Sequence, residues 1–240
     1  MIVEICANSY QSAVNAEEAG ADRIELCAEL AVGGITPSFG LIKKVSEKLS
    51  IPIHVLIRPR SGDFTYSKEE FEIMKTNIVL CADLGVSGIV SGVLQSDGTL
   101  DKTRTRELIS AGGDLKFTFH RAFDWVTDPI ETLGELEDLG VDCILTSGGR
   151  QSAEAAINQL DLWRENATKC VIMPGGGIRV HNALLFKNKG FEAIHLSGLN
   201  FSKTLDKKPE LSMNNAAYLR DDEIALTDPE IVRAVVQSVK

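Results

Sequence analysis

The sequence predicts a TIM barrel, an α/β fold in which eight parallel strands each precede a helix, formed by residues 1–240 as a single domain. Short runs rich in β-branched residues alternate with longer segments that suit helices, and eight such runs occur in 240 residues. A doubly wound sheet would usually need fewer strands for this length. No linker or shift in composition indicates a second domain.

The eight predicted strands follow one another along the chain. They cover residues 2–6, 23–27, 53–57, 88–91, 115–120, 142–146, 170–174 and 193–197. Parallel strands are usually covered on both faces and read as continuous apolar runs. In the first strand, however, Val3 and Ile5 alternate with Glu4 and Cys6. We therefore expect this strand to present a polar face to the barrel interior.

The segments between the strands carry signals that start and stop helices. Capping pairs with the appropriate spacing are Asn8 before Gln11, Ser67 before Glu70, and Asp128 before Pro129 and Glu131. Glycines suited to helix C-termini precede three of the strands, at positions 20, 85 and 140. These signals predict helices between successive strands, as a barrel of this kind requires.

The end of the chain departs from this pattern. Residues 199–227 are polar, lack helical periodicity and contain Pro209, which predicts an irregular segment acting as a lid, an oligomer arm or a mobile loop. A closing helix is expected over residues 228–240, with Asp228 as its N-cap and Pro229 in its first turn.

Charge, hydropathy and cysteine usage exclude several classes of protein. The net charge of -9 argues against a non-specific nucleic-acid binder, which needs clustered Lys and Arg. No apolar run approaches the roughly 18 to 20 residues of a membrane helix, and no leader pattern starts the chain, so we expect a cytoplasmic protein without a membrane partner. The five cysteines are odd in number and scattered, which favours free thiols.

The triplet Glu-x-Cys occurs in both of the first two predicted strands, as Glu4 with Cys6 and Glu25 with Cys27. Strand ends of this kind are where a TIM barrel carries its reactive groups. Thiols on neighbouring strands lie within reach of one small ion, and two thiolates suit the soft ion Cu(I). The alternative is that both cysteines pack as small apolar residues. The neighbouring glutamates would also raise the pKa of the thiols.

Glycine-rich turns follow the seventh and eighth predicted strands. The candidate anion-binding residues in them are Gly175, Gly176, Gly177, Ser197 and Gly198, and Arg58 and Arg60 follow the third strand. Backbone N–H groups at this position of a TIM barrel commonly hold phosphate. The alternative is that the glycines only allow a tight turn.

Ionisable residues at the strand ends suggest proton transfer. Glu4, Glu25 and His120 are the candidate acids and bases, and His195 is a further candidate base or ligand. The alternative is a network in which arginines, Arg121 among them, neutralise the carboxylates and close the barrel without any chemistry. Because buried ion pairs stabilise weakly, a pocket for a small anionic compound is preferred.

Taken together, these segments closely resemble the CutC copper homeostasis family over almost the whole chain. The matching blocks are EIC at 4–6, NAE at 15–17, GADRIELC at 20–27, GGITPS at 33–38, IRPR at 57–60, GDF at 62–64, TFHRAFD at 118–124, LTSG at 145–148 and MPGGGI at 173–178. So many blocks in one chain identify it as a member.

The resemblance implies a cytoplasmic TIM barrel that self-associates, with a dimer favoured, and that handles copper. It implies Cys6 and Cys27 as the Cu(I) ligands and no organic cofactor. Some members carry a further Cys directly after the His of the last strand, a position that Leu196 occupies in this chain.

Three hypotheses of different classes remain. The first is a copper homeostasis protein that binds Cu(I) through Cys6 and Cys27. The second is an enzyme that acts on a small phosphorylated or carboxylated metabolite by acid and base chemistry, using the anion-binding turns. The third is a scaffold that self-associates through residues 199–227.

Overall fold

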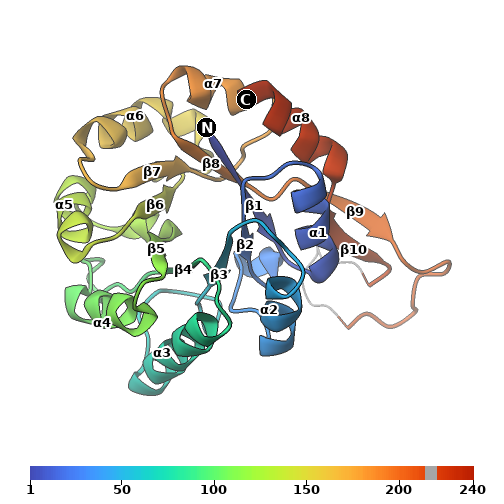
Figure 1. Cartoon of the computed structure of the whole chain (residues 1–240), viewed down its shortest axis with the longest axis horizontal. Coiled ribbons are helices and arrows are strands. Elements are labelled where there is room, and N and C mark those ends of the chain that lie inside the picture. Colours follow the sequence, from blue (N-terminus) through green and yellow to red (C-terminus); the bar gives the residue numbers. More distant parts are fainter. Residues whose placement is uncertain (214–220) are drawn as a thin grey trace.

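The computed structural model describes residues 1–213 and 221–240, and in it eight parallel strands form one barrel (Figure 1). The strands are β1 (Ile2–Ala7), β2 (Arg23–Leu26), β3 (Ile53–Leu56), β4 (Gly88–Ser91), β5 (Lys116–Phe119), β6 (Cys143–Thr146), β7 (Val171–Pro174) and β8 (Ala193–Leu196). They pair in the order β7-β6-β5-β4-β3-β2-β1-β8, and a parallel bridge between Gly175 and His195 closes the ring. The predicted single-domain TIM barrel is confirmed.

Helices surround the ring of strands (Figure 1). They are α1 (Tyr10–Glu18), α2 (Phe39–Ser46), α3 (Lys68–Asp83), α4 (Lys102–Gly112), α5 (Pro129–Leu139), α6 (Ile157–Asn166), α7 (Val180–Asn188) and α8 (Pro229–Val239). Short 3-10 helices cover Leu30–Val32, Arg121–Trp125 and Glu154–Ala156. Among the described residues, no helix combines the length and apolar character that crossing a membrane demands.

The alternation within β1 explains how the two faces of the sheet differ. Val3 and Ile5 are fully buried in the core between the strands and the helices. Glu4 and Cys6 therefore face the barrel interior, where Cys6 packs in a small separate cluster with Cys27 and Leu56. The polar interior face predicted for this strand is present.

The helix starts follow local capping chemistry. Ser67 forms a reciprocal capping box with Glu70, and Asp128 caps α5 with Pro129 in the first turn. The prediction for α1 is wrong by one residue, because Ser9 rather than Asn8 accepts the N–H of Ser12. The Asn8 side chain instead donates to the carbonyl of Ala225.

The irregular segment predicted over 199–227 is correct for residues 204–213 but not for its two ends, and residues 214–220 lie outside the described part of the chain. The two ends form an antiparallel ribbon of β9 (Leu199–Lys203) and β10 (Glu223–Thr227), which lies outside the barrel beside α1 (Figure 1). The Asn15 side chain donates to the Thr227 carbonyl, and the Thr227 N–H donates to Ser12. Cross-strand pairing between distant residues leaves no local periodic signal in a polar sequence, which is why the pattern missed it. Pro229 then opens α8, with Asp228 as its N-cap.

Candidate functional site

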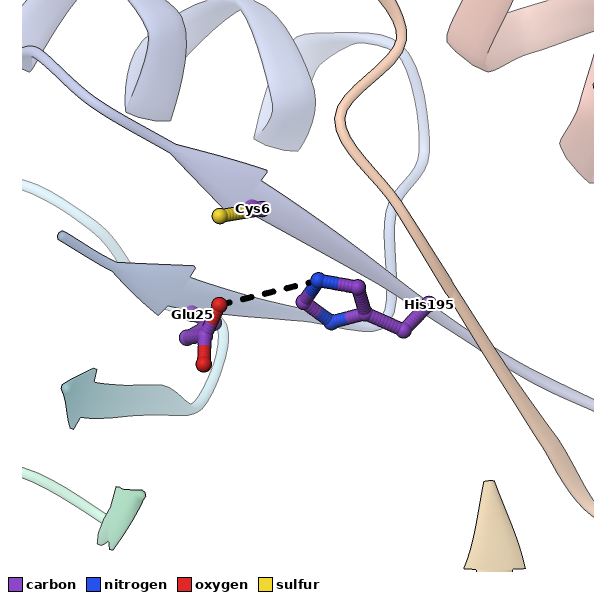
Figure 2. A group of neighbouring side chains, drawn as sticks. All are labelled: Cys6, Glu25 and His195. Carbon is purple, nitrogen blue, oxygen red and sulfur yellow. Dashed lines mark ion pairs between the residues drawn. The ribbon is translucent and has the colours of Figure 1, made fainter. Parts of the chain in front are cut away.

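A wall of charged side chains lines one side of the barrel interior, and we call it the polar wall. It consists of Glu4 and Cys6 from β1, Arg23 and Glu25 from β2, and His195 from β8. The strand register pairs Glu4 with both Arg23 and His195, and it pairs Cys6 with Glu25. Figure 2 shows Cys6, Glu25 and His195 pointing toward one another from these three strands.

Glu4 holds the centre of the polar wall as a carboxylate. It is fully buried, which alone would raise its pKa, but a hydrogen bond with His195 and the positive charges of Arg23 and His195 outweigh burial and lower the pKa to about 2. The bond joins Oε1 of Glu4 to Nδ1 of His195 at 2.7 Å, while Nε of Arg23 donates to Oε2. Glu4 therefore remains charged and orients the imidazole.

Glu25 differs from Glu4 although it also lies in the polar wall. Burial raises the pKa of Glu25, assisted by the negative charge of Glu4 and opposed by His195. Its carboxylate lies 3.6 Å from Nε2 of His195 (Figure 2). In turn, Glu25 and Glu4 raise the pKa of His195, although burial acts in the opposite direction. Glu25 and His195 can thus exchange or share a proton.

The two thiols of the Glu-x-Cys triplets meet at the top of this wall. The sulfur atoms of Cys6 and Cys27 lie 3.4 Å apart, although Cys27 sits two positions beyond Glu25, the partner of Cys6 in the register. Their hydrogen bond and burial raise the pKa of Cys6 well above that of an ordinary thiol. The separation far exceeds the roughly 2.05 Å of a disulfide, so both cysteines are free.

The remaining cysteines are isolated from this pair. Cys81 lies in α3, Cys143 in β6 and Cys170 immediately before β7, and all three are buried. Burial raises the pKa of Cys81 and Cys170 to about 12, and it raises that of Cys143 further. Inert packing residues have these properties.

A cavity of about 420 Å³ opens above the polar wall at the carboxyl ends of the strands, and we call it the mouth cavity. Cys6, Glu25 and His195 line it, whereas Cys27 does not. The other lining residues are Leu30, Val32, Gly33, Leu56, Arg58, Gly62, Phe64, His120, Arg121, Trp125, Leu145, Gly176, Gly177, Ile178, Arg179, Leu196 and Ser197.

His120 lines the mouth cavity but lies outside the polar wall. Burial and the neighbouring charge of Arg58 lower the pKa of His120 to about 3, so the ring is neutral. Its Nδ1 accepts the N–H of Ala122, which leaves the proton on Nε2. His120 therefore presents a hydrogen-bond donor at Nε2, whereas His195, the further candidate, contacts the carboxylates.

The two arginines after β3 point in different directions. Arg58 lines the mouth cavity and donates to the carbonyls of Val32, Gly34 and Gly62. Arg60 bonds to Glu70 and Asp63 on the outside and does not line the cavity. Two arginines at the mouth were predicted from this loop, but only Arg58 lies there, because the chain turns outward after Pro59.

The glycine turns are likewise only partly at the mouth. Gly176 and Gly177 line it with φ of +94° and +79°, whereas the Gly175 N–H donates to the Thr146 carbonyl. Ser197 also lines the cavity. Gly198 does not, because it packs against α8, where a Cβ would lie 3.2 Å from Val232. Of the predicted anion-binding residues in these two turns, Gly176, Gly177 and Ser197 therefore line the cavity.

Several residues of the site were missed or undervalued in the sequence. Period-two alternation from Glu25 would have placed Arg23 on the interior face. Arg121 was interpreted only as a neutralising charge, and Arg179 and Trp125 were not predicted, because all three lie in connections after strands whose path no local pattern fixes.

Comparisons with known proteins agree with this geometry. The model of the CutC family matches residues 1–200. A CutC family protein of Edwardsiella ictaluri is 44% identical over 197 residues, covering 82% of this chain and 78% of that protein. The CutC family protein of Proteus mirabilis is 38% identical over 235 residues, covering 97% and 94%. The solved structure of CutC from Streptococcus agalactiae superposes with a TM-score of 0.79 at 32% identity, covering 82% of this chain and 98% of that one. The chain therefore belongs to the CutC family.

Proposed function

We propose that this protein is a cytoplasmic copper homeostasis protein that binds one Cu(I) ion through Cys6 and Cys27. The name of the related Streptococcus agalactiae structure associates that protein with copper homeostasis. The observation that carries the proposal is the 3.4 Å separation of two free thiols beside an open cavity. Thiolates are the ligands that Cu(I) selects, and five free cysteines suit a reducing compartment.

The spacing of the two sulfurs favours a third ligand. Metal–thiolate bonds are about 2.3 Å long, so an ion bound to both sulfurs at their present separation would have a bent S–metal–S angle of about 95°. A bent pair leaves one side of the ion open. A further donor on the cavity side would complete the coordination.

His195 is the third ligand that we propose. One donor atom each from Cys6, Glu25 and His195 lies within 4.8 Å of the others, a group that contains one of the two proposed thiol ligands (Figure 2). Metal-binding imidazoles commonly engage a carboxylate through their other nitrogen, and Nδ1 of His195 has this partner in Glu4. His195 thus supplies a metal-binding nitrogen directly before Leu196, the position at which some family members carry a further Cys.

Binding requires the ligands to lose their protons. Because the pKa values of Cys6 and His195 are raised, the ion has to displace protons from both, and affinity rises with pH. The charge of Glu25 opposes thiolate formation in the free protein but balances the bound cation.

Anaerobic titration with Cu(I) against a competing chelator tests the proposal. We expect the parent to bind one ion, the variant Cys6→Ser, Cys27→Ser to lose at least about 100-fold in affinity, and His195→Asn to lose about 10- to 100-fold. Cys143→Ser is the matched control, because it removes an interior thiol outside the site and should bind as the parent does. Equal affinities of the parent and the double variant would refute the proposal.

We also propose that the protein self-associates as a homodimer through the β9–β10 ribbon. Phe201 and Ile224, which the strand register places on opposite faces of this ribbon, are 60% and 46% exposed, so each offers apolar surface to a second copy of the chain. Light scattering should give twice the chain mass for the parent and the chain mass for Phe201→Ser, Ile224→Ser. A monomeric parent would contradict this.

A further inference from the structure

The mouth cavity carries an excess of positive charge in an acidic protein. The chain has a net charge of -9, yet three guanidinium groups line the cavity, those of Arg58, Arg121 and Arg179. Among the described residues that line it, Glu25 is the sole carboxylate. A concave surface lined by one sign of charge concentrates ligands of the opposite sign. Copper, a cation, does not account for these arginines.

We infer that the mouth cavity binds a small organic anion, a phosphate monoester or a carboxylate joined to a flat apolar body. This site shares the cavity with the proposed copper ligands Cys6 and His195, but the residues that would hold the anion are different ones. Its acid-binding end lies at the turn after β7, and its apolar wall lies between β3 and the 3-10 helix after β5.

Donors at the turn after β7 are oriented and only partly used. Arg121 bonds to Asp124 through Nε and to Ser147 through Nη2, which fixes its guanidinium and leaves Nη1 available. A Cβ added to Gly176 would lie 3.8 Å from that Nη1, so the turn after β7 lies directly beside the guanidinium. The N–H groups of Gly176 and Gly177 donate to no acceptor in the described part of the chain. Preorganised donors around an open space suit an anionic group.

Arg179 adds a second charge next to the same turn. Its Nη1 donates to the carbonyl of Ile178, and within residues 1–213 and 221–240 no carboxylate forms an ion pair with it. A cavity-lining arginine without a carboxylate partner retains donors for a ligand.

Two buried donors supply independent support. Nε2 of His120 and Nε of Arg58 are buried, and neither finds a hydrogen-bond partner among the described residues. Both residues line the cavity, with exposed fractions of 5% and 6%. Buried polar atoms nearly always have hydrogen-bond partners in folded proteins. Two buried donors without partners at one cavity therefore indicate an oxygen atom of a ligand or of solvent.

Aromatic rings form another part of the cavity lining. The Phe64 and Trp125 rings lie 4.8 Å apart edge to face, and Phe64 also contacts the His120 ring. Trp125 is 58% exposed, although a tryptophan of a soluble protein is usually well covered. A volume of about 420 Å³ falls in the range of small-molecule sites, so a flat apolar ligand body fits against these rings.

Calorimetric titration with phenyl phosphate, phenylacetate and inorganic phosphate tests the inference. We expect at least one of the two aromatic anions to bind more tightly than inorganic phosphate. Whichever of phenyl phosphate and phenylacetate binds more tightly shows whether the site prefers a phosphate or a carboxylate. Arg179→Gln should weaken binding about tenfold, as the loss of a charged hydrogen bond does. The control Arg106→Gln, the same change at an exposed position of α4, should bind as the parent does.

The remaining variants separate the parts of the site. Trp125→Ala should weaken binding of the aromatic probe severalfold without affecting inorganic phosphate. Cys27→Ser removes a proposed copper ligand that does not line the cavity, so it should bind the aromatic probe with parental affinity. Failure of both aromatic probes to bind the parent at millimolar concentration would overturn the inference. Equal affinities of the parent and Arg179→Gln would overturn it as well.

Discussion

Two buried glutamates at opposite ends of the barrel have opposite electrostatic properties. Glu137 on α5 lies at the amino end of β7, where it accepts the N–H groups of Thr168, Lys169 and Cys170 and the Thr168 hydroxyl. Burial would raise its pKa, but these bonds outweigh it and lower the pKa to about 2. Glu25 at the carboxyl end has no such set of donors, and burial raises its pKa.

The difference shows which carboxylate stabilises the fold. Glu137 ties a loop to a helix, and its negative charge is matched by donors, so the charged form is favoured by folding. Glu25 is buried beside another carboxylate and two thiols, an arrangement that folding alone does not favour. The amino end of the barrel serves stability, and the carboxyl end retains unsatisfied groups for ligands.

The largest stability effect is expected at the amino end. Glu137→Gln should lower the free energy of unfolding at pH 7 by about 2 kcal/mol, allowing for solvent screening, because an amide cannot accept all four bonds. Urea unfolding measures this, and an unchanged midpoint and slope would contradict it.

Acid should remove the same contribution. Because folding lowers the pKa of Glu137 from 4.5 to about 2, its stabilisation is complete above pH 4.5 and is lost as the pH falls toward 2. The difference in unfolding free energy between the parent and Glu137→Gln should shrink over this range. A difference that stays constant to pH 2 would show that the charge contributes nothing.

A smaller effect is expected for the matched change in the polar wall. Glu25→Gln should change the unfolding free energy at pH 7 by about 1 kcal/mol or less, since folding already disfavours the charged form. It should also lower the pKa of His195, because the charge of Glu25 is the main influence that raises it. NMR titration of the imidazole protons measures this pKa. An unchanged His195 pKa would contradict the electrostatic pairing of Glu25 with His195.

The smallest effect is expected outside both regions. Arg60→Gln removes partly exposed ion pairs with Glu70 and Asp63, so it should cost less than about 1 kcal/mol in urea unfolding. Phenyl phosphate should bind this variant and the parent equally. A tenfold loss of affinity would place Arg60 at the mouth after all.

The barrel could be predicted from the sequence because its signals are local. Alternation within single strands placed Glu4 and Cys6 on one face and Val3 on the other, and capping motifs marked α3 and α5. Each observed barrel strand begins and ends within one residue of its prediction. Only short-range sterics and hydrogen bonding are needed for such inferences.

The site could be predicted only in part, because it depends on register and loop path. Alternation cannot show that Cys6 pairs with Glu25 or that His195 meets Glu4. Nor could it distinguish Arg60, which turns outward, from Arg179, which lines the cavity. Long-range packing determines these placements, as it does the β9–β10 ribbon.

X-ray absorption at the copper edge of the Cu(I)-loaded protein tests the central claim most directly, because it reports the atoms bound to the ion. We predict two sulfur neighbours and one nitrogen neighbour, with the sulfur signal absent in the protein that carries Cys6→Ser and Cys27→Ser. A spectrum of the parent with only nitrogen and oxygen neighbours would contradict the account.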